Sequence, residues 1–361
     1  MSNQLTRRDF AIRTTSLGLA MGLAPAATLA ETEQASRSET SPAVADPYSL
    51  VDPELLPTLK HFPASFDLSA ETVRQFRQLP GTPALPAPAP QPVERHIPGP
   101  PGAPEVRLWI VDPAPSEKNK PLLLHMHGGG FMMIGPGWMP LLQSIATDCH
   151  CVVVSVDYRL APETRYPGAL DDNYAALKWV HAHAAELGVD RSRIAVGGES
   201  AGGTHAASLA IHARDRNKED VPICFQLLIY PALDDRTGSS RPAPPAIGHF
   251  MWTASANRFA WSSLLGVPAG SSKVPVAAVP ARVASVAGLP PAWIGVGALD
   301  LFVEEDMEYA RRLVHAGVAT ELLVVRGAFH GFDLLVPDAE VSKQFTASWK
   351  FALRKAFATK S

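Results

Sequence analysis

Cysteine is scarce in this sequence, with three residues in 361, and this limits what can hold the fold together. Two of the three, Cys149 and Cys151, are separated by a single residue and are too close to pair comfortably. A disulfide framework of the kind found in small secreted domains is therefore not expected. We expect buried thiols in a fold that depends on its apolar core.

A strong charge of either sign is also missing. The 32 Lys and Arg residues and the 35 Asp and Glu residues give a formal net charge of −3, and no basic block interrupts the body of the chain. Nucleic acid is therefore not expected as a partner, since its binding relies on clustered Lys and Arg. The chain also lacks His-Glu-x-x-His and paired Cys-x-x-Cys spacing, so we expect no metal site.

The first thirty residues have the pattern of an export signal. A pair of arginines, Arg7 and Arg8, precedes a weakly apolar run rich in Ala and Gly from Thr14 to Ala30. That run is too short and too mild for a stable membrane span. We interpret residues 1–30 as a cleaved twin-arginine signal, which predicts a periplasmic or secreted protein. An ordinary amphipathic N-terminus and an uncleaved membrane tether are the alternatives.

The rest of the chain is expected to form one large domain after a short leader. Residues 31–47 are polar, which is typical of disorder. The chain as a whole is 46% apolar, enough for residues 48–361 to bury a full core. Spaced apolar residues from Pro53 to Leu79 predict one or two short helices, and the proline-rich stretch 80–104 predicts an extended connection.

From residue 106 onward, apolar runs of strand length alternate with helical patterns. The expected strands are 106–111, 122–127, 152–157, 194–198, 225–230, 292–296 and 321–325, and the expected helices are 169–187, 304–316 and 341–357. This alternation predicts an α/β fold with a mostly parallel sheet covered by helices on both faces. In such sheets the functional site lies at the carboxyl ends of the strands.

A serine lies at one of these ends, in Gly198-Glu199-Ser200-Ala201-Gly202. The spacing is typical of a sharp turn from strand to helix, in which the two glycines are needed because the chain passes close to itself. Ser200 would stand clear of the sheet as a nucleophile, and the N–H of Ala201 would point to where an oxyanion forms. A Gly-x-Ser-x-Gly string is a modest signal by itself.

A second motif, His127-Gly128-Gly129-Gly130-Phe131, directly follows a predicted strand. Three glycines allow a tight fold that aims bare N–H groups into a cavity, as a tetrahedral ester intermediate requires. A glycine run alone is more often a flexible turn, but the downstream serine motif favours the functional interpretation. We expect His127 to bond within the loop.

A base and an acid are expected downstream, in the order serine, acid, histidine. His330 lies in a loop after the last predicted strand, and Asp300 follows the strand at 292–296. Asp300 would accept the proton on Nδ1 of His330 and turn Nε2 toward Ser200. Three rival acids are Glu304, Asp306 and Asp333. We prefer Asp300 because the first two rivals would lie inside the following helix.

Taken together, five motifs resemble the bacterial hormone-sensitive-lipase family of α/β hydrolases, of carboxylesterase type. They are 127–130, 157–163, 198–203, 300–302 and 329–332, and the resemblance extends from about Tyr48 to the C-terminus. It implies a catalytic set of Ser200, Asp300 and His330. It also implies an oxyanion hole of Gly128, Gly129, Gly130 and Ala201, in which Gly128 shapes the turn and the others donate. Glu199 stands where many relatives have Asp or Thr.

The resemblance further implies a helical cap, built from residues 48–80 and about 235–280. Phe131 and Trp138 are candidates to line the substrate pocket, together with aromatic residues of the second segment. The aromatic residues of that segment are Phe250, Trp252, Phe259 and Trp261. Aromatic residues at helical spacing are more often part of the core.

The family resemblance implies a serine carboxylesterase that hydrolyses short to medium acyl esters through an acyl-enzyme intermediate and needs no cofactor. An amidase or arylformamidase would use the same residues, and a ligand-binding relative without enzymatic activity is an alternative of another class. Some relatives dimerise through the last strand and helix, which leaves a homodimer open.

Overall fold

The computed structural model describes residues 46–60, 68–79, 84–87, 89–134, 138–216 and 221–359. The predicted export signal and nearly all of the predicted leader lie outside these residues, so both stay predictions. Within the described part of the chain, no helix combines the length and the apolar character needed to cross a membrane.

An eight-stranded sheet forms the centre of the described residues, in the order β1-β2-β4-β3-β5-β6-β7-β8. β2 pairs antiparallel with both β1 and β4, and the other neighbouring pairs are parallel, which confirms the predicted mostly parallel sheet. The strands are β1 (Val93–Ile97), β2 (Val106–Val111), β3 (Lys120–Met126), β4 (Val152–Asp157), β5 (Val189–Glu199), β6 (Phe225–Ile229), β7 (Ala292–Gly297) and β8 (Thr320–Val325).

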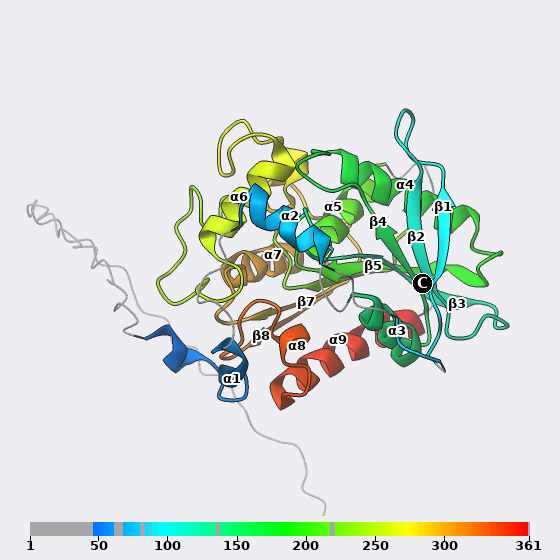
Figure 1. Ribbon diagram of the computed structural model, residues 1–361. Coiled ribbons are helices and arrows are strands. Elements are labelled where there is room, and N and C mark those ends of the chain that lie inside the picture. Colours follow the sequence, from blue (N-terminus) through cyan, green and yellow to red (C-terminus); the bar gives the residue numbers. More distant parts are fainter. Residues whose placement is uncertain are drawn as a thin grey trace, which may run out of the picture. The chain divides into compact units, whose positions relative to one another are not determined.

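Helices cover both faces of this sheet (Figure 1). One face carries α4 (Gly168–Ala182), α5 (Ala201–Asp215) and α7 (Val303–His315), and the other carries α3 (Trp138–Cys149) and α9 (Glu340–Ala358). Successive strand residues point to opposite faces, so Leu122 and Leu124 of β3 join one apolar cluster while Leu123 joins the other. Shorter elements complete the fold: η1 (Pro47–Leu50), α1 (Leu56–Leu59), η3 (Val276–Ala278), η4 (Pro280–Arg282) and α8 (Phe332–Leu335).

Among the longer elements, the sequence does not reveal β1 and α3. Strand β1 lies in the proline-rich stretch that was expected to be a mere connection, and four of its five residues are exposed, so it shows no apolar alternation. Helix α3 contains Pro140, which reads as a helix breaker. A proline is tolerated there because it lies in the first turn, where its missing N–H would have no intrahelical partner.

The three cysteines are free thiols. Cys149 and Cys151 are buried as expected, and Cys224 is half-buried. Burial raises the pKa of Cys149 to about 11 and that of Cys224 to about 12. Their thiolate forms are therefore rare near neutral pH, and the cysteines act as small apolar residues.

Two further helices, α2 (Ala70–Gln78) and α6 (Ala254–Leu265), contribute to one apolar cluster beside the start of α5. Val73 of α2 and Trp261 of α6 belong to this cluster together with Phe131 and Ala201. Helix α2 begins with a capping box at Ser69, and α6 ends at Gly266, whose φ of 70° places it in the left-handed region. Each segment in which a cap is expected therefore contributes a helix next to the glycine loop.

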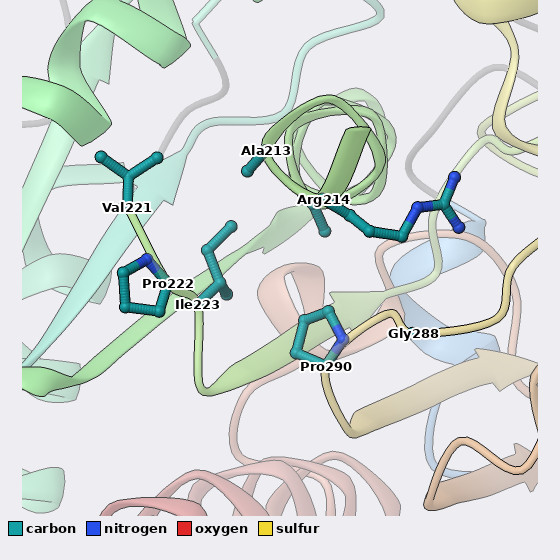
Figure 2. Close-up of a pocket in the computed structure, with 8 residues that line it drawn as sticks. Ala213, Arg214, Val221, Pro222, Ile223, Gly288 and Pro290 are labelled. Carbon is teal, nitrogen blue, oxygen red and sulfur yellow. The ribbon is translucent and has the colours of Figure 1, made fainter. Parts of the chain in front are cut away.

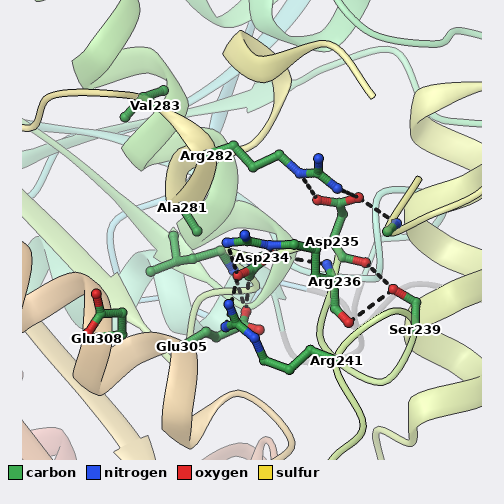
Figure 3. A network of polar contacts seen from close by, with 12 residues as sticks. Asp234, Asp235, Arg236, Ser239, Arg241, Ala281, Arg282, Val283, Glu305 and Glu308 are labelled. Atoms are coloured by element: carbon green, nitrogen blue, oxygen red, sulfur yellow. Dashed lines mark hydrogen bonds and ion pairs between the residues drawn. The ribbon is translucent and has the colours of Figure 1, made fainter. Parts of the chain in front are cut away.

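An ion-pair network anchors the segment that leaves β6 toward α6 (Figure 3). Asp234 pairs with Arg236 and Arg241, at 2.7 and 3.1 Å. The neighbouring Asp235 is completely buried and pairs with Arg282 at 2.6 Å. Because buried carboxylates are stable only when paired, these contacts fix the path of this segment over the sheet.

Candidate active site

Ser200 lies at the apex of the turn between β5 and α5, with φ 56° and ψ −121°. A positive φ is uncommon for a residue with a side chain, and here the surrounding backbone enforces it. A Cβ at Gly198 or Gly202 would come within 2.1 or 2.0 Å of the carbonyl oxygen of Met126. Both glycines are therefore required for the turn to pass over the end of β3.

A chain of two hydrogen bonds joins three side chains that are far apart in sequence. Oγ of Ser200 lies 2.9 Å from Nε2 of His330, and Nδ1 of the same ring lies 2.7 Å from Oδ2 of Asp300. The other oxygen of Asp300 accepts the N–H of Phe302 at 3.0 Å, which holds the carboxylate in place. The structure thus brings together the three residues that the sequence singles out as nucleophile, base and acid.

The three rival acids have other environments. Glu304 is exposed on α7, and Asp306 is buried with no hydrogen-bond partner for either oxygen among the described residues. Burial raises the pKa of Asp306 well above its ordinary value, so this carboxyl is neutral. Asp333 accepts the hydroxyl of Tyr230 at 3.0 Å instead of contacting His330.

The glycine loop presents free N–H groups next to Ser200. Gly129 and Gly130 have φ values of 115° and 62°, which suit glycine. Among the described residues, no acceptor is recorded for the N–H of Gly129, Gly130 or Ala201. Ala201 is the first residue of α5, where the helix dipole favours negative charge. These three groups can stabilise an oxyanion at Ser200.

Gly128 has a different role from the other three residues of the predicted oxyanion hole. Its N–H donates to Oε1 of Glu199 at 3.1 Å, so it is already occupied and cannot serve a substrate oxygen. A Cβ at this position would lie 3.0 Å from the carbonyl oxygen of Glu199. Gly128 therefore shapes the turn, as expected, and its N–H is not one of the oxyanion donors.

The start of the loop is held by two aromatic side chains. Nδ1 of His127 bonds the carbonyl oxygen of Gly128 at 2.8 Å, and the hydroxyl of Tyr158 donates to the carbonyl oxygen of His127 at 2.7 Å. Burial lowers the pKa of His127, which keeps the ring neutral. His127 thus bonds within the loop, as expected. Glu163, at the end of the motif 157–163, is 63% exposed and pairs with Arg77 of α2 at 2.8 Å.

Of the two predicted substrate contacts, Phe131 packs into the core and Trp138 bonds to the sheet. Phe131 is 2% exposed, and its ring packs on Trp261 at 5.0 Å between centroids, so it offers almost no surface to a ligand. Trp138 donates its indole N–H to Ser155 of β4 at 3.2 Å. Phe131 adopts a φ of 68°, a backbone angle that the sequence does not reveal.

Among the aromatic residues expected in the second cap segment, Trp252 lies beside the serine site. A Cβ at Gly130 would meet the indole ring at 2.5 Å, and the indole lies 6.0 Å from the ring of His330. Its N–H donates to Asn257 at 3.2 Å, which fixes the ring. Trp252 is one of the four aromatic residues expected in the second cap segment. The sequence does not separate it from the other three, because its position depends on contact with the folded glycine loop.

A separate cavity of about 430 Å³ lies away from this site (Figure 2). Its lining includes Arg214 at the end of α5, Ile223 before β6 and Pro290 before β7. These positions are at the amino ends of the strands, whereas Ser200 follows the carboxyl end of β5. The cavity therefore takes no part in the chemistry around the serine.

Comparisons with known proteins agree with this geometry. A family model described as the alpha/beta hydrolase fold matches residues 123–334, which is more than half of the chain. The chain is 36% identical to esterase LipI of Mycobacterium tuberculosis over 299 residues, covering 80% of this chain and 89% of LipI. It is 37% identical to carboxylesterase NlhH of the same species over 331 residues, covering 87% and 99%. The solved structure of a bacterial heroin esterase matches with a TM-score of 0.74 at 35% identity, covering 88% of this chain and all of that one.

The buried carboxyl of Asp333 generates a prediction about stability and pH. Burial raises its pKa to about 6 from an ordinary value of 3.8. The native state thus keeps a proton that the unfolded chain releases, so the Asp333 contribution to stability is lost as pH rises from about 4 to 6. Asp333→Asn keeps an oxygen that can accept from Tyr230 but does not titrate. Relative to the native protein, its free energy of unfolding should therefore rise by at most about 3 kcal/mol between pH 4 and pH 6.

The measurement is urea unfolding of both proteins at pH 4 and pH 7. Asp338→Asn, a change at an exposed site five residues further on, is the control and should show no such gain. If Asp333→Asn differs from the native protein by the same free energy of unfolding at both pH values, the pKa of Asp333 is not raised in the folded state.

Proposed function

Because the chain belongs to the bacterial hormone-sensitive-lipase family of α/β hydrolases, we propose that it is a serine carboxylesterase with Ser200 as its nucleophile. The observation that carries the proposal is the hydrogen-bonded series from Ser200 through His330 to Asp300, together with three backbone N–H groups that have no acceptor among the described residues. The names of the two mycobacterial relatives support the reaction class.

In the first half of the reaction, Oγ of Ser200 attacks the ester carbonyl while Nε2 of His330 takes the hydroxyl proton. Asp300 holds the ring by Nδ1 and stabilises the imidazolium that results. The carbonyl oxygen becomes an oxyanion and accepts hydrogen bonds from the N–H groups of Gly129, Gly130 and Ala201. Each such donor contributes about 3 to 4 kcal/mol to the chemical step in well-studied hydrolases.

The tetrahedral intermediate then collapses. Nε2–H of His330 gives its proton to the alkoxide oxygen, the alcohol leaves and the acyl group remains on Ser200. In the second half, water attacks the acyl carbon as His330 takes its proton. Collapse of the second intermediate returns the proton to Oγ and releases the carboxylic acid.

The substrates are proposed to be esters with short to medium acyl chains. Trp252 supports this, because its indole stands beside both Gly130 and His330 and limits the room near the reacting carbonyl. Acyl transfer does not identify the leaving group, so an amidase would use the same residues. A series of p-nitrophenyl esters from acetate to palmitate, with the matching p-nitroanilides, separates these substrates.

Export is proposed from the sequence of residues 1–30 alone, with the mature enzyme in the periplasm or outside the cell. A homodimer is proposed from the edge strand β8. Leu322 and Val324 of this strand are 38% and 39% exposed, and Met307 and Val314 on α7 extend the apolar surface. An apolar strand edge of this kind favours pairing with a second copy.

Ser200→Ala should abolish hydrolysis of p-nitrophenyl butyrate, because no other group can form the acyl-enzyme. Asp300→Asn should lower kcat by about 10³- to 10⁴-fold, since the ring of His330 loses its orientation. Initial rates and circular dichroism are measured together. Ser208→Ala changes a serine of equal burial on α5 and should retain activity. Turnover that survives in folded Ser200→Ala would refute the proposal.

Replacement of Arg7 and Arg8 by lysine should retain the protein in the cytoplasm of a host with twin-arginine export. Fractionation and the N-terminal sequence of the periplasmic product are the measurements, and cleavage is expected near Ala30. Export that does not depend on the two arginines would contradict the signal assignment.

A charge on the β8 edge should dissociate the dimer, because two copies of Val324→Lys would place like charges in an apolar contact. Light scattering should give a dimer for the native protein and a monomer for this variant. Val93→Lys, on the opposite edge strand and 61% exposed, is the matched control and should stay dimeric. A native protein that is monomeric at micromolar concentration excludes the proposed interface.

A further inference from the structure

A buried polar series lies directly behind the serine and ends on the glycine loop. The indole N–H of Trp138 donates to Oγ of Ser155 at 3.2 Å, and that oxygen lies 2.9 Å from Nδ1 of His125. Nε2 of His125 lies 2.9 Å from Oε2 of Glu199, whose other oxygen accepts the N–H of Gly128 at 3.1 Å.

The series is closed to solvent along most of its length. His125 and Ser155 are 1% and 0% exposed, and Glu199 is 7% exposed. Three parallel neighbours in the sheet supply these groups, since His125 is in β3, Ser155 in β4 and Glu199 at the end of β5. Water cannot substitute for a missing partner there, so each hydrogen bond has structural consequences.

The direction of these hydrogen bonds follows from the two groups at the ends of the series, the indole of Trp138 and the carboxylate of Glu199. An indole N–H can only donate, so Ser155 accepts from Trp138 and its own O–H is free to donate to Nδ1 of His125. A carboxylate can only accept, so Nε2 of His125 carries the hydrogen that faces Glu199. One neutral tautomer of His125 satisfies every group, provided that Glu199 is ionised.

The environment of Glu199 supports the ionised form. Burial alone would raise the pKa of this carboxyl, but the N–H groups of His125 and Gly128 that face it outweigh burial and lower the pKa. The carboxylate is thus held between a fixed donor on the sheet and the first N–H of the glycine loop.

We propose that Glu199 is a positioning residue, whose buried carboxylate holds Gly128 so that the next two N–H groups of the loop stay aimed at the reacting carbonyl oxygen. The inference rests on the proposed function, because it concerns stabilisation of the same oxyanion. Glu199 touches no substrate and acts through the backbone of the loop. Its place next to Ser200 couples the turn that carries the nucleophile to the loop that carries the donors.

Glu199→Gln tests this coupling, because it keeps the shape and removes the charge. If the amide oxygen of the new side chain accepts the N–H of Gly128, the NH2 group of the same amide must face Nε2 of His125. That nitrogen carries a hydrogen in the native protein, so two donors would then face each other. The loop should loosen, and kcat for p-nitrophenyl butyrate should fall about 10- to 100-fold, less than complete loss of one donor. KM should change by less than about three-fold, since oxyanion contacts form only in the transition state.

The concentration of active sites is measured by labelling Ser200 with a fluorophosphonate. Rates are divided by this concentration, so that unfolded protein does not lower the apparent kcat. Glu117→Gln is the matched control, because Glu117 makes the same contact with a histidine, His150, at 2.8 Å on the exposed surface. This variant should keep the native kcat. Glu199→Asp keeps the charge with a shorter reach and should recover part of the loss.

Ser155→Ala provides a second route if Glu199→Gln does not fold. It removes the hydroxyl that links Trp138 to His125 and should lower kcat by a smaller factor, again with little change in KM. Native kcat in Ser155→Ala, or in folded Glu199→Gln, would overturn the inference. Ester hydrolysis by the native protein reports on the proposed function separately, since a native protein without turnover refutes that function whatever the variants do.

Discussion

The site depends on one close crossing of the backbone, in which the turn from β5 to α5 passes over the carbonyl oxygen of Met126. Gly198 and Gly202 make this crossing possible, because a Cβ on either would lie about 2 Å from that oxygen. Met126 is also the last residue of β3, from which the glycine loop departs. One steric contact therefore places the nucleophile and the oxyanion donors at the same edge of the sheet, before any side-chain hydrogen bond is considered.

Side-chain hydrogen bonds then refine what the crossing establishes. On one side of Ser200, Asp300 orients His330, and on the other side Glu199 holds the first residue of the glycine loop. Both carboxylates are buried and each accepts a backbone N–H as well as a histidine nitrogen. In surroundings of low polarity such paired bonds are strong and costly to break, so the free N–H groups remain fixed without help from the substrate.

The sequence predicts the parts of this arrangement that are local. The serine turn and the glycine loop each lie within five consecutive residues, and the order of acid and histidine follows from the order of the strands. Contacts between distant residues are not visible in this way. His125 reads as one more core residue of a strand, because its partner Glu199 is 74 positions away and only the adjacency of β3 and β5 brings them together. Phe131 was misjudged for a related reason, since the positive φ of its backbone turns the ring into the core.

The most direct test is a crystal structure of the protein after reaction with a phosphonate ester, whose phosphoryl group imitates the tetrahedral intermediate. We expect phosphorus bonded to Oγ of Ser200 and one phosphoryl oxygen within about 3.1 Å of the N–H groups of Gly129, Gly130 and Ala201. A phosphonate attached to another residue, or an oxygen that turns away from all three N–H groups, would contradict this expectation.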